Sequence, residues 1–304
     1  MSDAYLIAAI PQGSTHRYWK MIHGGALKAA RELQDSGTPV ELVWKGPIRE
    51  GDQEEHKQIV ENFVRKRVHG MLLVPFDSIH LVSTVEAAAH DGIPTVILDS
   101  ELDTRQIVSF VATDNEKAGA LAADRMGELL HGKGRVFLQR YQKGSASTEA
   151  REAGFAERVR KSYPNMEVVS SSEYAGATRD TAKRAAEVFL AKYKDVFPGV
   201  FTPNESSTTG MLMALQGIQL ANKMAFVGFD YSDTLSAALR GKQIQGLVAQ
   251  NPFRMGELGL RTLVDHLQGK SVSKRLDTAA TMVTPQNLDS PAIQQLLNPP
   301  MPVA

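Results

Sequence analysis

The sequence has no cysteine among its 304 residues. Disulfide bridges, thiolate metal sites and cysteine nucleophiles are therefore excluded. It also has no excess of charge of one sign, because Lys plus Arg and Asp plus Glu both number 34. A nucleic-acid-binding surface needs a basic excess, so this balance argues against a nucleic-acid partner.

Long apolar runs are also missing. Runs such as Met71–Pro75 and Thr95–Leu98 have the length of a strand, whereas a membrane-spanning helix needs about 20 apolar residues. The opening residues 1–3 do not resemble the basic and then apolar stretch of a secretory signal. We therefore expect either a cytosolic protein or an extracytoplasmic one whose signal lies outside this chain.

Motifs for catalysis and cofactor binding are absent as well. The turn at Pro11–Arg17 lacks the G-x-G-x-x-G of dinucleotide binding, and Gly127–Gly134 has glycine where a phosphate loop needs Ser or Thr. There is no G-x-S-x-G elbow, and the histidines are scattered rather than spaced for zinc. We expect no cofactor, no metal and no enzyme activity, although a carboxylate pair formed in three dimensions stays open.

What the sequence does have is a regular alternation of strand-like and helix-like segments. Tyr5–Ile10 and Val40–Trp44 are short apolar runs, and Tyr18–Leu33 and Gln53–Lys66 repeat apolar residues at helical spacing. The period of about 30 residues is that of one strand–helix unit. This pattern predicts an α/β fold with parallel sheets covered by helices, in two domains, followed by a surface tail from Pro285 onward.

Polar and aromatic residues gather just after the expected strands. In open parallel sheets, ligands bind beyond the carboxyl ends of the strands, so these positions are the candidate site. Each of them is also explained as a loop or helix-capping residue. The positions are Gln12–Trp19, Asp77, Asp99–Ser100, Asp114–Asn115, Tyr141, Asn204–Glu205, Asp230–Tyr231 and Gln250–Asn251.

Five motifs, in this order and spacing, carry a family resemblance. The chain resembles the ribose-binding-protein-like group of type I periplasmic, or solute-binding, proteins of sugar ABC transporters, which are related to the ligand-binding cores of lactose-repressor-type regulators. The motifs are Ile10 with Tyr18-Trp19 and Gly25-Ala26; Gly92–Asp99; Ala112–Asn115 with Gly119; Ser147–Phe155; and Asn204-Glu205 with Val227–Asp230 and Ala249-Gln250.

The resemblance implies two doubly wound parallel-sheet lobes joined by three crossing segments. The N-terminal lobe would comprise residues 1–112 plus 251–278, and the C-terminal lobe residues 113–250 plus 279–304. It also implies that a sugar or polyol is captured in the interlobe cleft, that hinge closure follows, and that the closed form meets an ABC permease. By the same resemblance, the protein would be a monomer in the periplasm or another extracytoplasmic compartment.

Nine residues would form the ligand site by this resemblance. Aromatic faces suit the C–H patches of a sugar, carboxylates accept from its hydroxyls, and a guanidinium donates in a fixed fork. We expect two aromatic residues to form a platform, a polar set to clamp the hydroxyls, and Phe229 to pack beside the ligand or support its neighbour. The nine are His16, Tyr18, Trp19, Asp99, Arg151, Asn204, Phe229, Asp230 and Gln250.

Structural roles compete with several of these assignments. Trp19 also suits the core under the first helix, Asp99 a turn, Arg151 an exposed first helical turn, and Asp230 the N-cap of the next helix. For Asp114 we favour a structural role at the start of a helix.

Departures from the ribose binders widen the choice of ligand. The loop that reads Asn-Pro-Phe-Phe in those proteins is His16–Trp19 here, and Ser100 stands where they have arginine. The predicted ligand is therefore a pentose, hexose, polyol or modified sugar. The alternative function is the sensing core of a lactose-repressor-type regulator, which would need a DNA-binding segment before residue 1.

Overall fold

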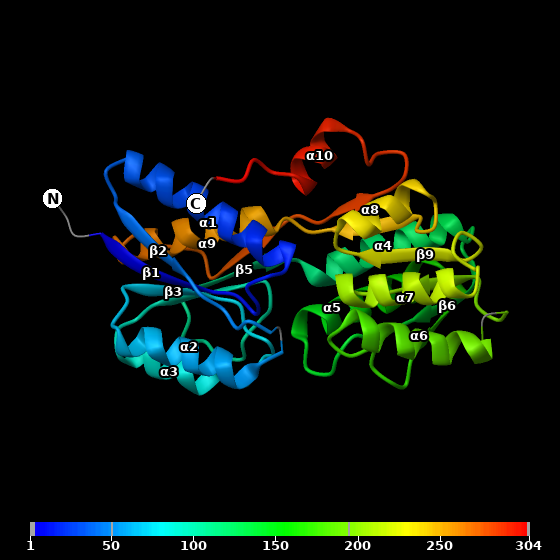
Figure 1. Ribbon diagram of the computed structural model, residues 1–304, viewed down its shortest axis with the longest axis horizontal. Helices are drawn as coiled ribbons and strands as arrows, with labels where there is room; N and C mark the ends of the chain where they lie inside the picture. Colours follow the sequence, from blue (N-terminus) through cyan, green and yellow to red (C-terminus); the bar gives the residue numbers. More distant parts are fainter. Residues whose placement is uncertain (1–3, 50, 194, 303–304) are drawn as a thin grey trace. The chain divides into compact units, whose positions relative to one another are not determined.

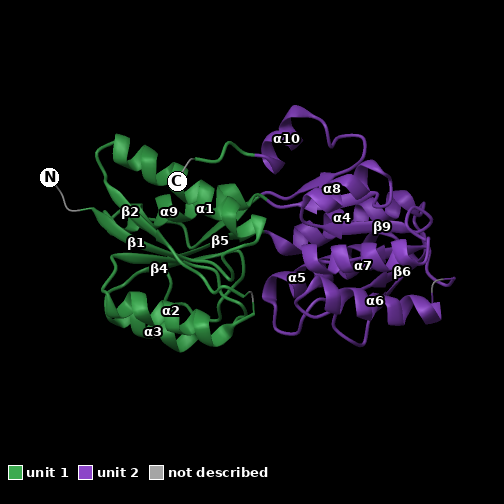
Figure 2. Cartoon of the chain, in the orientation of Figure 1, with its two compact units in different colours: residues 1–113, 251–278, 299–304 green, residues 114–250, 279–298 purple. Residues whose placement is uncertain are grey.

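The computed structural model describes residues 4–49, 51–193 and 195–302. The chain divides into two compact units, drawn in green and purple in Figure 2. Unit 1 comprises Met1–Thr113, Asn251–Thr278 and Pro299–Ala304, and unit 2 comprises Asp114–Gln250 and Ala279–Asn298. Within the described part of the chain, every helix is too short or too polar to cross a bilayer.

Unit 1 is built on one sheet whose strands are all parallel, in the order β11-β5-β4-β3-β1-β2. Two of its strands, β1 and β2, have the bounds predicted from the sequence. Its elements are β1 (Tyr5–Ile10), α1 (Arg17–Asp35), β2 (Val40–Trp44), α2 (Gln53–Arg65), β3 (Gly70–Leu73), α3 (Val82–His90), β4 (Thr95–Leu98), β5 (Ser109–Thr113), α9 (Pro252–Leu267) and β11 (Arg275–Thr278).

Helices cover both faces of this sheet because both faces of its central strands are apolar. On one face, α1 and α9 bury Ile22 and Leu260 against the strands. The other face is covered by α2 and α3 (Figure 1), which bury Phe63 and Val85. This arrangement leaves the carboxyl ends of the strands as the edge where polar residues gather.

Unit 2 repeats the plan with the sheet order β12-β10-β9-β8-β6-β7. One core packs α4 and α5 on the sheet, and the other packs α6, α7, α8 and α10. Its elements are α4 (Asn115–Leu129), β6 (Lys133–Leu138), α5 (Ala146–Ser162), β7 (Asn165–Ser170), α6 (Arg179–Tyr193), β8 (Gly199–Phe201), α7 (Glu205–Gly217), β9 (Ala225–Phe229), α8 (Asp233–Arg240), β10 (Gly246–Ala249), β12 (Thr281–Val283) and α10 (Pro291–Leu297).

The predicted fold class, two doubly wound lobes dominated by parallel strands, is confirmed. Three details differ from the prediction. Strand β12 runs antiparallel to β10, and the expected surface tail contains α10, which buries Ile293 and Leu297. Residues from Pro299 onward belong to unit 1 rather than to the lobe predicted for 279–304, because Met301 packs against Gly24 of α1.

Candidate functional site

Asp99 lies at the carboxyl end of β4 in unit 1. Its backbone has a left-handed φ of 66°, and its N–H donates to the carbonyl of Val111 on β5 at 3.0 Å. The hydroxyl of Tyr18 donates to its Oδ1 at 2.5 Å, and the residue is 7% exposed. The structure thus fixes a carboxylate at the strand end and couples it to a tyrosine of α1.

The start of α1 carries the other three predicted residues of unit 1. His16 is the N-cap, and its Nδ1 accepts from the backbone N–H of Tyr18 at 3.2 Å. Trp19 is 5% exposed within the core, and its ring meets the Tyr18 ring edge-on at a centroid distance of 5.0 Å. Trp19 therefore packs in the core against Tyr18, which agrees with the predicted structural role of Trp19. Its contact with a ligand stays a prediction.

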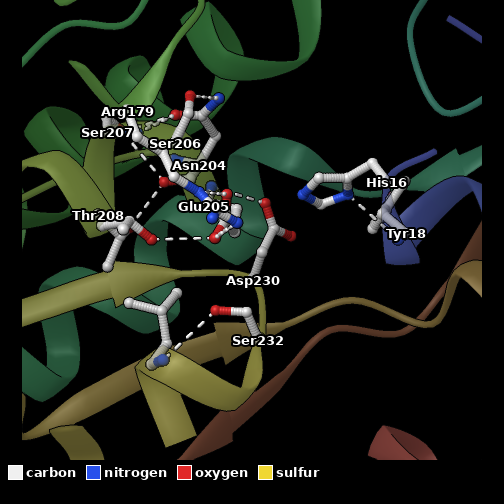
Figure 3. A network of polar contacts seen from close by, with 12 residues as sticks. His16, Tyr18, Arg179, Asn204, Glu205, Ser206, Ser207, Thr208, Asp230 and Ser232 are labelled. Atoms are coloured by element: carbon white, nitrogen blue, oxygen red, sulfur yellow. Dashed lines mark hydrogen bonds and ion pairs between the residues drawn. The ribbon is translucent and has the colours of Figure 1, made fainter. Parts of the chain in front are cut away.

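Asp230 occupies the corresponding place after β9 in unit 2. Its φ is also 66°, and its N–H donates to Val248 of β10 at 2.9 Å. Its Oδ1 accepts from Nε2 of Gln250 at 2.7 Å. Its Oδ2 accepts from the backbone N–H of Glu205 at 3.1 Å (Figure 3). The N-cap reading of Asp230 is wrong, because Ser232 caps α8.

Asn204 is the N-cap of α7, which confirms the helix-capping interpretation of this position. Its Oδ1 accepts from the backbone N–H of Ser207 at 3.2 Å and from the Ser207 hydroxyl at 2.6 Å (Figure 3). Its Nδ2 donates to Ser206 at 3.2 Å. This capping box starts α7 at Glu205.

Arg151 is 3% exposed on α5, so its surface reading is wrong. Its Nε donates to Oδ1 of Asn115 at 2.8 Å, and one terminal nitrogen donates to the carbonyl of Pro203 at 3.0 Å. The guanidinium lies 4.1 Å above the centroid of the buried Phe229 ring. All three groups that hold this buried cation are neutral, which leaves its charge available to a strong acceptor.

Two further polar residues support this arrangement. Asn115, the first residue of α4 after the N-cap Asp114, was among the post-strand candidate positions but not among the nine predicted ligand residues, and it orients Arg151. Glu205 is buried and pairs with Arg179 at 2.7 Å.

Next to Arg151, burial raises the pKa of Glu152 even though Arg140 donates to its carboxylate at 3.1 Å. The predicted structural role of Asp114 is present, because its side chain accepts from Lys117 N–H.

Across residues 4–49, 51–193 and 195–302, no three His, Cys, Asp or Glu side chains come together in a way that would hold an ion.

The family model described as a periplasmic binding protein domain matches residues 7–271. The chain belongs to this family. The resemblance predicted from the five motifs is thereby confirmed. The family comprises sugar-binding components of transport systems rather than a class of enzymes, and the periplasmic binding proteins of ABC importers act in the periplasm.

Relatives of this periplasmic binding protein are named after sugars. The ribose import binding protein of Bacillus subtilis is 26% identical over 236 residues, which cover 77% of this chain and 75% of the relative. The D-allose-binding periplasmic protein of Escherichia coli is 29% identical over 224 residues, 71% of each chain.

Solved structures of similar proteins have the same fold and hold sugars. A carbohydrate transporter solute binding protein from Agrobacterium radiobacter, in complex with D-arabinose, is 29% identical with a TM-score of 0.90, covering 98% of this chain and 100% of its own. An ABC transporter solute binding protein from Agrobacterium vitis with bound D-fucose is also 29% identical, with a TM-score of 0.87, covering 96% and 99%.

Proposed function

We propose that this periplasmic binding protein binds a monosaccharide or polyol for an ABC importer and releases it chemically unchanged. The observation that carries the proposal is the pair Asp99 and Asp230, each fixed in a left-handed conformation just after the fourth strand of its unit. A carboxylate accepts from two neighbouring hydroxyls, which suits a polyhydroxylated ligand.

The surrounding groups support the same ligand class. Arg151 supplies a buried donor above an aromatic ring, and Gln250 is 6% exposed beside Asp230. Tyr18 presents an aromatic ring together with a hydroxyl that already contacts Asp99. Buried polar groups of this kind discriminate strongly, because a ligand that lacks one hydroxyl leaves its partner unsatisfied.

The identity of the sugar is proposed only as a class. The relatives named above bind ribose, allose, D-arabinose and D-fucose, which span pentoses and hexoses. We infer that a pentose, hexose or polyol is the ligand here, and that Ser100, in place of the arginine of ribose binders, argues against ribose itself. The permease partner, the monomeric state, a periplasmic or extracytoplasmic location and closure around the ligand belong to the same proposal and rest on the resemblance.

A sugar panel tests the proposal directly. Calorimetric titration with D-ribose, D-allose, D-arabinose, D-fucose and xylitol should find at least one that binds saturably. After incubation with the protein, the NMR spectrum of that sugar should be unchanged, as expected for a binding protein rather than an enzyme. If every sugar and polyol fails to bind protein that has been stripped of ligand by unfolding and refolding, the proposed function is wrong.

Two substitutions test the carboxylate pair. Asp99→Asn and Asp230→Asn each remove a charged acceptor, a loss of about 1.5 kcal/mol or more, so each should weaken sugar binding at least ten-fold. The matched control is Asp103→Asn, an exposed position four residues after Asp99, which should keep its affinity. Affinity that does not change in either test variant would remove that residue from the site.

A further inference from the structure

Thr208 on α7 joins two parts of unit 2 that the proposed sugar site uses. Its side chain is fully buried, and its hydroxyl contacts both the N-cap of α7 and the last residue of β9. The cap is Asn204, and the last residue of β9 is Phe229, which immediately precedes Asp230. The hydroxyl therefore links the start of the helix directly to the end of the strand.

The hydrogen bonds of this hydroxyl can be assigned in full. A threonine hydroxyl has one hydrogen and two lone pairs. Its hydrogen goes to the backbone carbonyl of Asn204 at 2.7 Å (Figure 3), which is closer than the carbonyl of Phe229 at 3.3 Å. The two lone pairs then accept from the backbone N–H of Phe229 at 3.1 Å and from the Thr202 hydroxyl at 2.8 Å. Removal of the hydroxyl would take the acceptor away from two buried donors at once.

The carboxylate of Asp230 depends on the same link. Its Oδ2 accepts from the backbone N–H of Glu205, the first residue of α7, at 3.1 Å. That bond forms only while the start of the helix and the end of the strand keep their separation. Thr208 fixes this separation, because it bonds Asn204 and Phe229, the chain neighbours of Glu205 and Asp230.

Phe229 is held by Thr208 because its N–H lies beyond the reach of the sheet. Successive N–H groups of a strand point to opposite neighbours, and the N–H of Asp230 donates to Val248 of β10. The N–H of Phe229 points the other way, past the end of β8, where the Thr208 hydroxyl accepts it. The Phe229 ring supports the guanidinium of Arg151 at 4.1 Å, so Thr208 contacts the strand end that carries two site residues.

From these contacts we propose that Thr208 is a positioning residue for sugar binding, which acts through Asp230 and Phe229 without touching the ligand. The inference rests on the proposed function, since it takes Asp230 as a ligand-binding residue. The hydroxyl carries the role, because every contact described above is made by its oxygen.

Two substitutions separate the hydroxyl of Thr208 from its methyl group. Thr208→Val keeps the branched shape without the hydroxyl, and Thr208→Ser keeps the hydroxyl. Calorimetric titration uses each sugar that binds the parent protein, among D-ribose, D-allose, D-arabinose, D-fucose and xylitol. Thr208→Val should weaken binding about five-fold or more, the equivalent of one lost hydrogen bond, and Thr208→Ser should stay within about two-fold.

The matched control is Thr209→Val at the next residue of α7. Thr209 is also buried, and its hydroxyl donates to the Glu205 carboxylate at 2.9 Å rather than to Asn204 or Phe229. Its loss should leave sugar affinity within about two-fold of the parent, since a single buried hydrogen bond of α7 is removed but the link to β9 stays. Equal affinities of Thr208→Val and Thr208→Ser, or an equal loss in Thr209→Val, would overturn the inference.

The Asp230→Asn background tests whether Thr208 acts through Asp230. There, Thr208→Val should cause a further loss of less than about two-fold, because the effects of residues that act through one another do not add. A general loosening of unit 2 would instead weaken binding by the same factor in both backgrounds, and that result would contradict the positioning role.

Amide hydrogen exchange of the sugar-free protein, followed by NMR, tests the link without a ligand. The N–H of Glu205 should exchange about ten-fold faster in Thr208→Val than in the parent protein and at the parent rate in Thr208→Ser. If Thr208→Val does not fold, Thr208→Ala makes the same comparison. If no sugar of the panel binds the parent protein, the proposed function fails, and exchange still decides on Thr208: protection of the Glu205 N–H that survives loss of the hydroxyl would show that Thr208 does not hold this arrangement.

Discussion

The two units have the same backbone plan but use different side chains at the same places. In each unit the fourth strand along the chain is followed by an aspartate with a φ of 66°, whose N–H donates to the fifth strand. In unit 1 the carboxylate of Asp99 accepts from a tyrosine, and in unit 2 that of Asp230 accepts from an amide and a backbone N–H. The shared fold thus determines where an acceptor lies, and the loops determine which groups it contacts.

A pair of glycines makes the second parallel between the units. In each unit, the helix after the first strand (α1 or α5) crosses the helix with which the chain enters from the other unit (α9 or α4), at a glycine of each. A Cβ on Gly25 or Gly256 would overlap a backbone carbonyl of the partner helix in unit 1, and the same is true of Gly119 and Gly154 in unit 2. Close backbone contact of this kind requires glycine.

Buried titratable groups separate the two units. Both units bury carboxylates that have partners, which in unit 1 are Asp99 and Glu257. Unit 1 also buries His56, for which neither ring nitrogen has a partner among the described residues. Unit 2 buries Arg151, Glu152 and Glu205, all of which have partners. Acid should therefore act on the two units in different ways.

The largest expected effect breaks the shared helix crossing. Gly25→Ala in unit 1 and Gly154→Ala in unit 2 should each lower the free energy of unfolding by about 3 kcal/mol or more, the upper end of the cost of overpacking. The reason is that the obstacle is backbone, which cannot rotate away. Urea unfolding followed by circular dichroism measures the loss.

The control for this pair is Gly217→Ala, in the last turn of α7. A Cβ there meets nothing within 4 Å, so alanine should raise stability by about 0.5 kcal/mol through its better helix propensity. If Gly154→Ala proves as harmless as Gly217→Ala, the crossing in unit 2 tolerates a side chain and the parallel between the units fails.

The next effect should appear in unit 1 on acidification. Burial, with the nearby His80 adding to it, lowers the pKa of His56 from its usual 6.5 to about 4. The folded protein thus favours neutral His56, and between these values the unfolded chain binds the extra proton. The contribution of neutral His56 to the free energy of unfolding should be complete above pH 6.5. The free energy of unfolding should then fall by up to about 3 kcal/mol as the pH drops toward 4.

Urea unfolding at pH 7.5, 6.0 and 4.5 checks this expectation. His56→Phe cannot take up a proton and should flatten the dependence, whereas His90→Phe, at a side chain that is 91% exposed, should leave it as in the parent protein. If the units unfold in separate transitions, the acid-sensitive one should be unit 1. A pH dependence that is the same in parent and His56→Phe would show that other groups cause it.

Much of the fold was readable from the sequence because buried parallel strands are continuous apolar runs. The elements that were missed lack such runs. Strand β11, Arg275–Thr278, alternates exposed and half-buried residues before Thr278, and α10 has only seven residues, of which Ile293 and Leu297 are buried. Edge elements and short helices are held by tertiary contacts, which local periodicity does not record.

The candidate site was predictable in position but not in contacts. Residues just after strands could be found from the strand pattern alone, and Asp99 and Asp230 were among them. The guanidinium of Arg151 is oriented by hydrogen bonds to Asn115 and to the carbonyl of Pro203, which are 36 and 52 residues away in the chain. The cap formed by Asn204 uses a serine three residues on, instead of the glutamate or glutamine of the usual capping box.

The smallest expected effect sharpens the first parallel, that between Asp99 and Asp230. Alanine and glycine at either position both remove the carboxylate, so the difference between the two variants reports the backbone alone. A positive φ is unfavourable for alanine and open to glycine. We therefore expect Asp99→Gly to be more stable than Asp99→Ala by about 1 kcal/mol, and Asp230→Gly more stable than Asp230→Ala by a similar amount. Melting temperatures of the four variants without sugar measure both differences. If the backbone at one of these positions were relaxed, its alanine variant would be as stable as its glycine variant or more stable. That result in only one unit would show that the backbone conformations of Asp99 and Asp230 are maintained in different ways.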